Sequence, residues 1–544
     1  MKPRVTWSQK ALIVILGTAV VGSTIAVARR DYSFFDPLVA VKAVVSQRYV
    51  DVPDEAAMQL GAINGMLEVL NDPYTEYVPP AATREFNKDL TGDFVGIGVS
   101  IVTRDGWLTV VTPLEDTPAF RAGIMPDDRI VEINGKSTQG LTGDECVALL
   151  TGEPGTDVGI VVERGAERMP ITITRERIIA RTVKGFHWEK AGPSGTWKYL
   201  IDPARKIAYV RLTQFTPTSA GEFAEALTAI GADRGEIKGL VFDLRFNPGG
   251  VLGDAIEIAD LFLKEGVIVS TKGRAVPEEI SRAVEPGTLP DFPIAVLVNG
   301  ASASASEIVS GALAENNRAI VVGTRTFGKG LVQAVVPIPQ SRGAQLKITE
   351  QRYYLPSGRS LNRGDDSTEW GVDPTDGFYV PMTDEQLVEL VRARRQEEQL
   401  GRTATAADQA RWSDPEWIVD YLKDPQLAAA IKAVQARIDT GAWTPTGQST
   451  AQGGAIAGDE LRRLRLARER FLRDLARLER RVEALETNAV AGAEPAVKDF
   501  WDDAIDLAGG RLQVLDKDGK PVATLKITGN NLERWLIDAD VEKD

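Results

Sequence analysis

Three short segments rich in small residues hold the side chains of this sequence that could do chemistry. Each follows an apolar run, and their sequences are Asp-Leu-Arg-Phe-Asn-Pro-Gly-Gly at 243–250, Asn-Gly-Ala-Ser-Ala-Ser-Ala-Ser-Glu at 299–307, and Gly-Thr-Arg-Thr-Phe-Gly-Lys-Gly at 323–330. Glycine lets a backbone turn its amides toward a ligand, and loops at strand ends often carry function. The three segments are therefore candidates for one catalytic or binding site.

The third segment matches most of a phosphate-binding P-loop, Gly-x4-Gly-Lys. Gly330 stands where that motif needs a Ser or Thr to hold magnesium, and the residues that follow, 331–338, have the pattern of a strand rather than of a helix. The sequence therefore does not favour nucleotide binding.

Lys329 is instead a candidate general base. Among Gly, Phe and Thr at a strand end its charged form would be disfavoured by desolvation, and a neutral amine can take the proton of a serine. The only histidine, His187, lies outside the three segments, so a Ser–His–Asp triad has no convincing base. A serine-rich helix start also has a simpler explanation, because serines at helix N-caps satisfy free amides. The residues by themselves leave both explanations open.

The three segments together resemble the signatures of the carboxyl-terminal processing (tail-specific) serine proteases. Those signatures are Asp-Leu-Arg-x-Asn-x-Gly-Gly, Ser-Ala-Ser-Glu and Thr-Phe-Gly-Lys-Gly, and all occur here in order. The resemblance covers about residues 35–380. It includes Gly-Met-Leu at 65–67, Asp-Pro-Tyr-Thr-Glu-Tyr at 72–77, the Gly-Ile-Gly-Val loop of a PDZ domain at 96–99, and Tyr-Tyr-x-Pro-x-Gly-Arg-Ser at 353–360.

The resemblance implies a serine endopeptidase that processes or degrades proteins from or near their C-termini. It places the nucleophile at Ser304 and the general base at Lys329, with Gln333 supporting the lysine. It places the oxyanion hole at the amides of Ala305 and Gly250, the second of the paired glycines. It implies no metal and no cofactor. A PDZ adaptor that binds tails without cutting them is the main alternative, against which the intact dyad residues speak.

The PDZ segment implies recognition of the substrate's tail. The backbone of Gly96, Ile97, Gly98 and Val99 is expected to bind a free C-terminal carboxylate while the tail pairs with the strand that follows. Thr151 stands where an arginine is common in the family. Whether an occupied PDZ domain activates the protease is therefore left open.

A chain of 544 residues is longer than one hydrophobic core usually organises, so we expect several domains. The elements that position the candidate residues predict a multidomain α/β protein. Short β-branched runs punctuated by glycine begin at 91, and apolar strands then alternate with helices as in an α/β layer fold. We expect a signal peptide or membrane anchor (1–30), a helical N-terminal region (31–90), a small β-rich PDZ domain (91–176), an α/β layered serine protease core (177–380), and a C-terminal extension (381–544). The extension is expected to be helical, with a coiled-coil-like helix at 459–486 and a β-hairpin at 512–527.

The N-terminus has the form of an export signal. Three basic residues precede an uncharged run, 11–28, which Arg29 and Arg30 end, and Ala-Val-Ala at 26–28 has the form of a cleavage site. A cleaved signal and a retained membrane anchor both remain open. Either one predicts an extracytoplasmic protein, periplasmic or in the cell envelope.

Composition and the apolar spacing near the C-terminus constrain the partners. Hydrophobic residues make up 43% and charged residues 26%, as in ordinary globular proteins. A net charge of −14, with no basic stripe, argues against nucleic acid. Apolar residues in 459–486 recur at three- and four-residue steps, which fits either a helical hairpin within the monomer or a coiled coil between subunits of a homo-oligomer.

Overall fold

The computed structural model describes residues 33–83, 86–87, 93–191, 194–341, 343–364, 367–398 and 405–450, together with some residues between 457 and 482 and the strands near 511–526. The chain divides into two compact units, 1–459 and 460–544. The predicted export signal at 1–30 lies outside the described residues. Within the described part, no helix has the length and apolar character needed to cross a membrane.

The N-terminal region consists of two helices and a strand. Helices α2 (Asp36–Arg48) and α3 (Glu55–Glu68) agree with the sequence pattern, and neither buries any of its side chains. Asp54 caps α3 by accepting hydrogen bonds from the amides of the two residues after Glu55. Strand β1 (Glu76–Val78) then pairs antiparallel with β21 (Ala344–Tyr354), so this region supplies one strand to a sheet of the protease core.

The β-rich domain is a twisted sheet with two short helices, as predicted. The strand order is β3-β4-β5-β7-β8, and β2 pairs with β9 where the domain begins and ends. The bounds are β2 (Asp93–Gly96), β3 (Val99–Arg104), β4 (Trp107–Pro113), α5 (Pro118–Arg121), β5 (Arg129–Ile133), β6 (Lys136–Ser137), α6 (Gly143–Leu150), β7 (Asp157–Arg164), β8 (Glu167–Thr174) and β9 (Glu176–Ile179).

The β-branched run at 95–102, whose pattern predicts one strand, is divided between two strands in the structure. Gly98 has φ +80, a conformation that favours glycine, and a Cβ there would lie 2.3 Å from Cβ of Thr117. The chain therefore turns between β2 and β3, and the turn contains the Gly-Ile-Gly-Val loop.

The protease core is built on a largely parallel sheet, which confirms the predicted α/β layer fold. Four parallel strands run in the order β14-β15-β18-β19, and two short strands pair antiparallel with β14. The bounds are β10 (Val183–Lys184), β13 (Leu200–Asp202), β14 (Ile207–Leu212), β15 (Gly239–Asp243), β18 (Ile294–Val298) and β19 (Ile320–Gly323). Every residue of β15, β18 and β19 is buried, so both faces of the sheet are covered.

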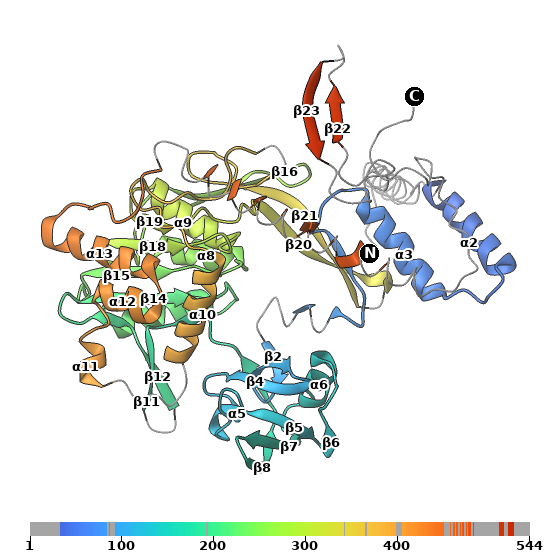
Figure 1. Ribbon diagram of the computed structural model, residues 1–544, viewed down its shortest axis with the longest axis horizontal. Coiled ribbons are helices and arrows are strands. Elements are labelled where there is room, and N and C mark those ends of the chain that lie inside the picture. Colours follow the sequence, from blue (N-terminus) through green and yellow to red (C-terminus); the bar gives the residue numbers. More distant parts are fainter. Residues whose placement is uncertain are drawn as a thin grey trace, which may run out of the picture. The chain divides into compact units, whose positions relative to one another are not determined.

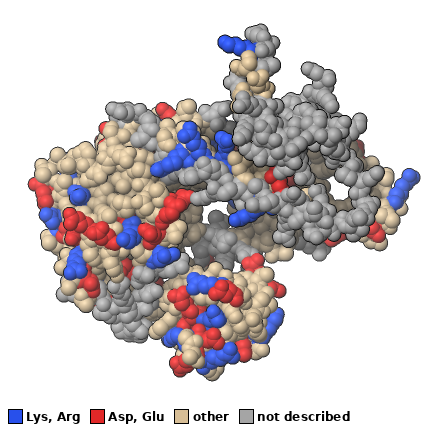
Figure 2. Space-filling model, in the orientation of Figure 1, with Lys and Arg blue, Asp and Glu red and all other residues tan. Residues whose placement is uncertain are grey.

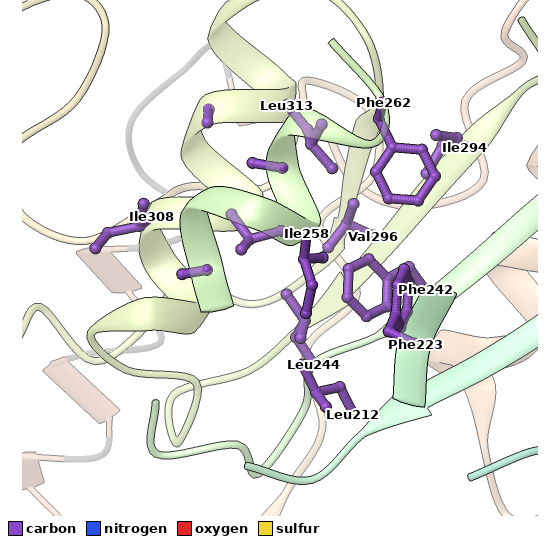
Figure 3. Close-up of a cluster of buried hydrophobic side chains, with 14 of the residues drawn as sticks. Leu212, Phe223, Phe242, Leu244, Ile258, Phe262, Ile294, Val296, Ile308 and Leu313 are labelled. Atoms are coloured by element: carbon purple, nitrogen blue, oxygen red, sulfur yellow. The ribbon is translucent and has the colours of Figure 1, made fainter. Parts of the chain in front are cut away.

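Helices α7 (Ser219–Ala229), α8 (Leu252–Asp260) and α9 (Ala305–Glu315) bury their apolar residues in one cluster with side chains of the sheet. In Figure 3, Ile258 and Leu313 from these helices meet Phe242 and Val296 from the strands. Burial of this kind contributes about 25 cal/mol per Å² of apolar surface, so this layer is a main source of stability.

The other face of the sheet is covered by helices from beyond residue 381, which the sequence had placed in a C-terminal extension. Ile431 and Val434 of α13 (Pro425–Thr440) share a second core cluster with the strands, and a Cβ at Gly239 would lie 2.4 Å from Val434. Helices α10 (Asp384–Glu397), α11 (Ala406–Gln409) and α12 (Pro415–Leu422) belong to the same unit (Figure 1). The sheet is thus the middle of three layers.

A second sheet has the order β1-β21-β16-β17, with β20 also paired to β21. The strands of this sheet not yet given are β16 (Val267–Gly273), β17 (Glu279–Arg282) and β20 (Leu331–Ile338). A separate hairpin consists of β11 (His187–Ala191) and β12 (Ser194–Lys198). On the face shown in Figure 2, acidic and basic side chains of the described residues are intermixed.

The second unit contains the predicted β-hairpin as β22 (Arg511–Leu515) and β23 (Pro521–Lys526), paired antiparallel. The described residues between 461 and 482 are helical and expose Leu464, Phe471 and Leu478. Much of the predicted coiled-coil-like segment, 459–486, lies outside the described residues, so the coiled coil stays a prediction.

Candidate active site

The first two candidate segments meet at the carboxyl edge of the parallel sheet, because β15 and β18 are parallel neighbours and each segment follows one of them. The side chain of Asn299 accepts hydrogen bonds from the amides of Phe246 (3.0 Å) and Ala301 (3.1 Å), and the Ser302 hydroxyl donates to the carbonyl of Leu244 (2.8 Å). These bonds lock together two loops that are far apart in sequence.

Ser304 stands at the entrance to α9 in a strained backbone conformation. Its φ is +55 and its ψ −113, which a residue with a side chain rarely adopts, and such strain gathers at functional sites. Ser304 is also the N-cap of α9 and forms a capping box with Glu307, so the simpler role of a serine N-cap applies to this residue as well. The residue is 6% exposed. Burial raises the pKa of the neighbouring Tyr353 phenol to about 12, and the Ser304 hydroxyl opposes that rise.

The glycine pair packs directly against the nucleophile candidate. A Cβ at Gly249 would lie 2.8 Å from Cβ of Ser304 and 2.9 Å from N of Ala305. The Gly249 amide already donates to Asn247 Oδ1 at 2.9 Å, whereas in the described structure the amides of Gly250 and Ala305 donate no hydrogen bond. The amide of Ala305 also opens α9, where the helix dipole favours negative charge. These two amides are available to an oxyanion.

Glu307 is a functional residue that the sequence reasoning quoted in a motif without giving it a role. Its fully buried carboxylate accepts four hydrogen bonds, from Ser304 N (2.7 Å), Thr326 Oγ1 (2.6 Å), Gly328 N (2.7 Å) and Lys329 N (2.9 Å). Burial raises the pKa of this carboxyl, and the four donors oppose the rise. The signal was available, since a Glu three residues after a helix-starting Ser is the acidic half of a capping box.

Lys329 lies beside the nucleophile's loop, held through its own backbone amide. Burial, followed by the charge of Lys347, lowers the pKa of the Lys329 amine, and the carboxylates of Glu307 and Asp72 act in the opposite direction. Its Nζ lies 4.8 Å from the centre of the Tyr74 ring. Among the described residues no hydrogen bond joins this Nζ to the hydroxyl of Ser304.

Gln333, the predicted support of the lysine, and His187, the histidine rejected as a base, make no hydrogen bond with the lysine amine in the described structure. Gln333, on β20, donates from Nε2 to Thr349 Oγ1 at 3.3 Å, not to the lysine. His187, on β11, is buried, with its ring 5.4 Å from that of Trp412 and its Nδ1 3.6 Å from Glu397 Oε2. In the described structure the contacts of His187 are with these residues rather than with the three candidate segments.

The predicted carboxylate-binding loop has free amides. The carbonyls of Ile97 and Gly98 accept hydrogen bonds from Ala119 (2.8 Å) and Leu114 (2.9 Å), while their own amides donate none within the described residues. Strand β3, which starts at Val99, packs near α6. The loop and this groove have the arrangement that captures a peptide C-terminus in β-augmentation.

The chain matches Peptidase family S41 over residues 206–375, a range that includes Ser304 and Lys329. It matches the PDZ domain over residues 109–164 and the Activating protease CtpB N-terminal domain over residues 28–81. The three matches occur in the order of the helical, β-rich and α/β regions described above.

Two relatives and one solved structure are similar to parts of this chain. A carboxy-terminal-processing protease of Bartonella bacilliformis is 38% identical over 320 residues, covering 58% of this chain and 70% of the relative. A probable CtpA-like serine protease of Staphylococcus aureus is 34% identical over 336 residues, covering 61% of this chain and 64% of that protein. The solved photosystem II D1 C-terminal processing protease is 27% identical, covers 62% of this chain and 85% of its own, and has a TM-score of 0.37.

Proposed function

Since the chain belongs to the carboxy-terminal-processing serine proteases of peptidase family S41, we propose that Ser304 and Lys329 are its catalytic dyad. The observation that most supports this assignment is the Glu307 carboxylate, which accepts from the backbone amides of both residues and so holds their loops together. The strained backbone conformation of Ser304 is the second support. A non-catalytic PDZ adaptor would need neither feature.

The dyad performs acyl transfer. Neutral Lys329 takes the proton of the Ser304 hydroxyl while Oγ attacks the peptide carbonyl, and the amides of Ala305 and Gly250 stabilise the oxyanion. The lysine then gives its proton to the leaving amine, and water hydrolyses the acyl-enzyme by the reverse sequence of proton transfers. For the first step Nζ must move from the Tyr74 ring to the serine hydroxyl. We place Gln333 as a support of the lysine in that engaged position.

The PDZ domain supplies the preference for C-termini. The amides at Gly96 to Gly98, of which those of Ile97 and Gly98 are free, bind the carboxylate of a protein's tail, which extends along Val99 and β3 beside α6. Protein tails are therefore the substrates. The export segment at 1–30 places the enzyme outside the cytoplasm, cleaved or membrane-anchored, and the apolar seam at 459–486 provides for self-association.

Ser304→Ala tests the assignment. Purified protein starting at Asp31 is incubated with an unstructured protein that has an apolar tail, and fragments are followed by mass spectrometry. We expect Ser304→Ala to lower kcat at least about a thousandfold with the fold retained. Ser310→Ala is the matched control, since its hydroxyl bonds back to backbone carbonyls of α9, those of Ser306 and Glu307. Cleavage by Ser304→Ala at the wild-type rate would refute the dyad.

A further inference from the structure

The aromatic ring of Tyr74 is the partner of the Lys329 ammonium in this structure. Nζ lies 4.8 Å from the ring centre, which is within cation–π range, and no hydrogen bond of this Nζ occurs in the described part of the chain. The contact is long-range in sequence, because Tyr74 comes from the segment between α3 and β1.

Tyr74 is held in place by a small network rather than by chance. Asp72 Oδ1 accepts from the Tyr74 amide (3.0 Å), and Asp72 Oδ2 accepts from Thr75 Oγ1 (2.6 Å). The Thr75 hydroxyl in turn accepts from the amide of Thr349 on β21 at 3.1 Å. Strand β1, which begins two residues after Tyr74, also pairs with β21. The ring is therefore anchored to the same sheet that carries the residues around the lysine.

The ring and the charges around the lysine favour opposite protonation states. The negative face of an aromatic ring stabilises an ammonium and gives little to a neutral amine. Asp72 on the same segment and Glu307 on α9 also favour the ammonium, whereas burial and Lys347 on β21 favour the neutral amine. To reach the hydroxyl of Ser304, Nζ must leave the Tyr74 ring.

We propose that Tyr74 is a positioning residue that holds the Lys329 ammonium on its ring in the resting protein, and so determines how readily this lysine becomes the base for Ser304. The proposal rests on the dyad proposed above. It gives the Asp-Pro-Tyr-Thr segment of the N-terminal region a direct role in the chemistry of the core.

The test compares Tyr74→Leu with Tyr74→Phe, which keeps the ring, in the full chain. Two readouts are followed against pH: kcat/KM on a free-tailed peptide, and the rate at which an amine-acylating reagent labels Lys329, measured by mass spectrometry. Tyr74→Leu should lower both midpoints by about half a unit to one unit, because the ammonium loses its partner, while Tyr74→Phe leaves both unchanged. Tyr49→Leu, at an exposed tyrosine, is the control and should change neither.

The outcomes separate this proposal from the dyad itself. If Tyr74→Leu keeps both wild-type midpoints, or Tyr74→Phe shifts as far as Tyr74→Leu, the ring does not hold the lysine and the proposal is overturned. If labelling of Lys329 shifts in Tyr74→Leu but Ser304→Ala still cleaves, the ring holds the lysine, and the dyad fails together with the ring's role in its chemistry. Tyr74→Met replaces Tyr74→Leu if thermal melting shows that the leucine variant does not fold.

Discussion

Glu307 joins the two residues of the proposed dyad through their backbones. Its carboxylate is fully buried and accepts from Ser304 N and Lys329 N at once, so a small displacement of this side chain moves nucleophile and base relative to each other. Misplacement of reacting groups by about 1 Å can cost about a hundredfold in rate. The residue therefore acts on catalysis without touching the substrate.

Glu307→Gln tests this positioning role. The glutamine side chain has the shape of the glutamate but turns an NH2 group toward the backbone N–H donors. We therefore expect kcat to fall about 10- to 100-fold with KM nearly unchanged. Glu315→Gln on the same helix is the control, since that carboxylate accepts from the amide of Ser357 at the surface. Equal kcat values for wild type and Glu307→Gln would show that the buried carboxylate is structural only.

The pH dependence of cleavage should report the lysine. Burial and Lys347 lower the pKa of the Lys329 amine, so activity should rise with pH through that lowered pKa and be lost below it, where the ammonium cannot accept a proton. Lys329→Arg should be inactive at every pH, because a guanidinium stays protonated. His187→Ala should keep the profile. A profile that follows His187 instead would require a histidine base.

Removing a neighbouring positive charge should move that profile in a known direction. Lys347→Ala deletes a charge that disfavours the Lys329 ammonium, so the rising limb of kcat/KM should shift to higher pH. Lys272→Ala, at an exposed lysine paired with Glu278, is the control and should leave the limb in place. A shift to lower pH in Lys347→Ala would contradict the electrostatic argument.

At the scale of elements, the end of β15 is tied to the C-terminal helices by a buried ion network. Arg245 bonds Asp243 (2.9 and 2.7 Å) and Asp424 (2.7 and 2.8 Å), the N-cap of α13, and Arg394 of α10 reaches Asp243 at 3.1 Å. The two arginines hold the pKa of Asp243 far below its usual range, against its burial. The stability this carboxylate contributes is thus present above its unfolded pKa, near 3.9, and is lost as pH falls below it.

Asp424→Ala should break this network, because it leaves Arg245 buried with half its partners and removes the cap of α13. Loss of one partner from a buried ion pair costs about 3–5 kcal/mol, which should appear as a lower free energy of unfolding in denaturant titration. Asp439→Ala, near the other end of α13, is the control: its pair with Arg205 is exposed and should contribute about 1 kcal/mol or less. Similar losses in both variants would show that α13 is not anchored through Arg245.

At the scale of the whole molecule, cleavage should depend on the tail's free carboxylate. Amidating a substrate's C-terminus should raise KM for the wild type, because the amides at Gly96 to Gly98 lose their anion. Gly98→Ala should remove the difference between free and amidated tails, since the new Cβ would lie 2.3 Å from Cβ of Thr117. Gly106 also has a positive φ, but the space around it is open. Gly106→Ala is therefore the control and should keep the difference between free and amidated tails. Equal rates for both tails in the wild type would leave the domain without this role.

The sequence by itself determined the class and order of the elements and the positions of the reactive residues. The apolar strands 239–244 and 294–298 and the helices that begin at 219, 252 and 304 follow local periodicity, and the structure has them within a few residues. Ser304 and Lys329 stand in motifs whose residue types mark them without any knowledge of their surroundings.

Only the tertiary structure decided how distant segments meet. The structure shows that α13 covers the second face of the sheet, that Arg245 bonds Asp424, and that Tyr74 lies over Lys329. These are contacts between residues far apart in the chain. Local pattern carries no information on such pairs, because a helix with an apolar stripe can pack on any apolar face. Their partners follow from the closure of the core as a whole, and so does the position of the Lys329 amine.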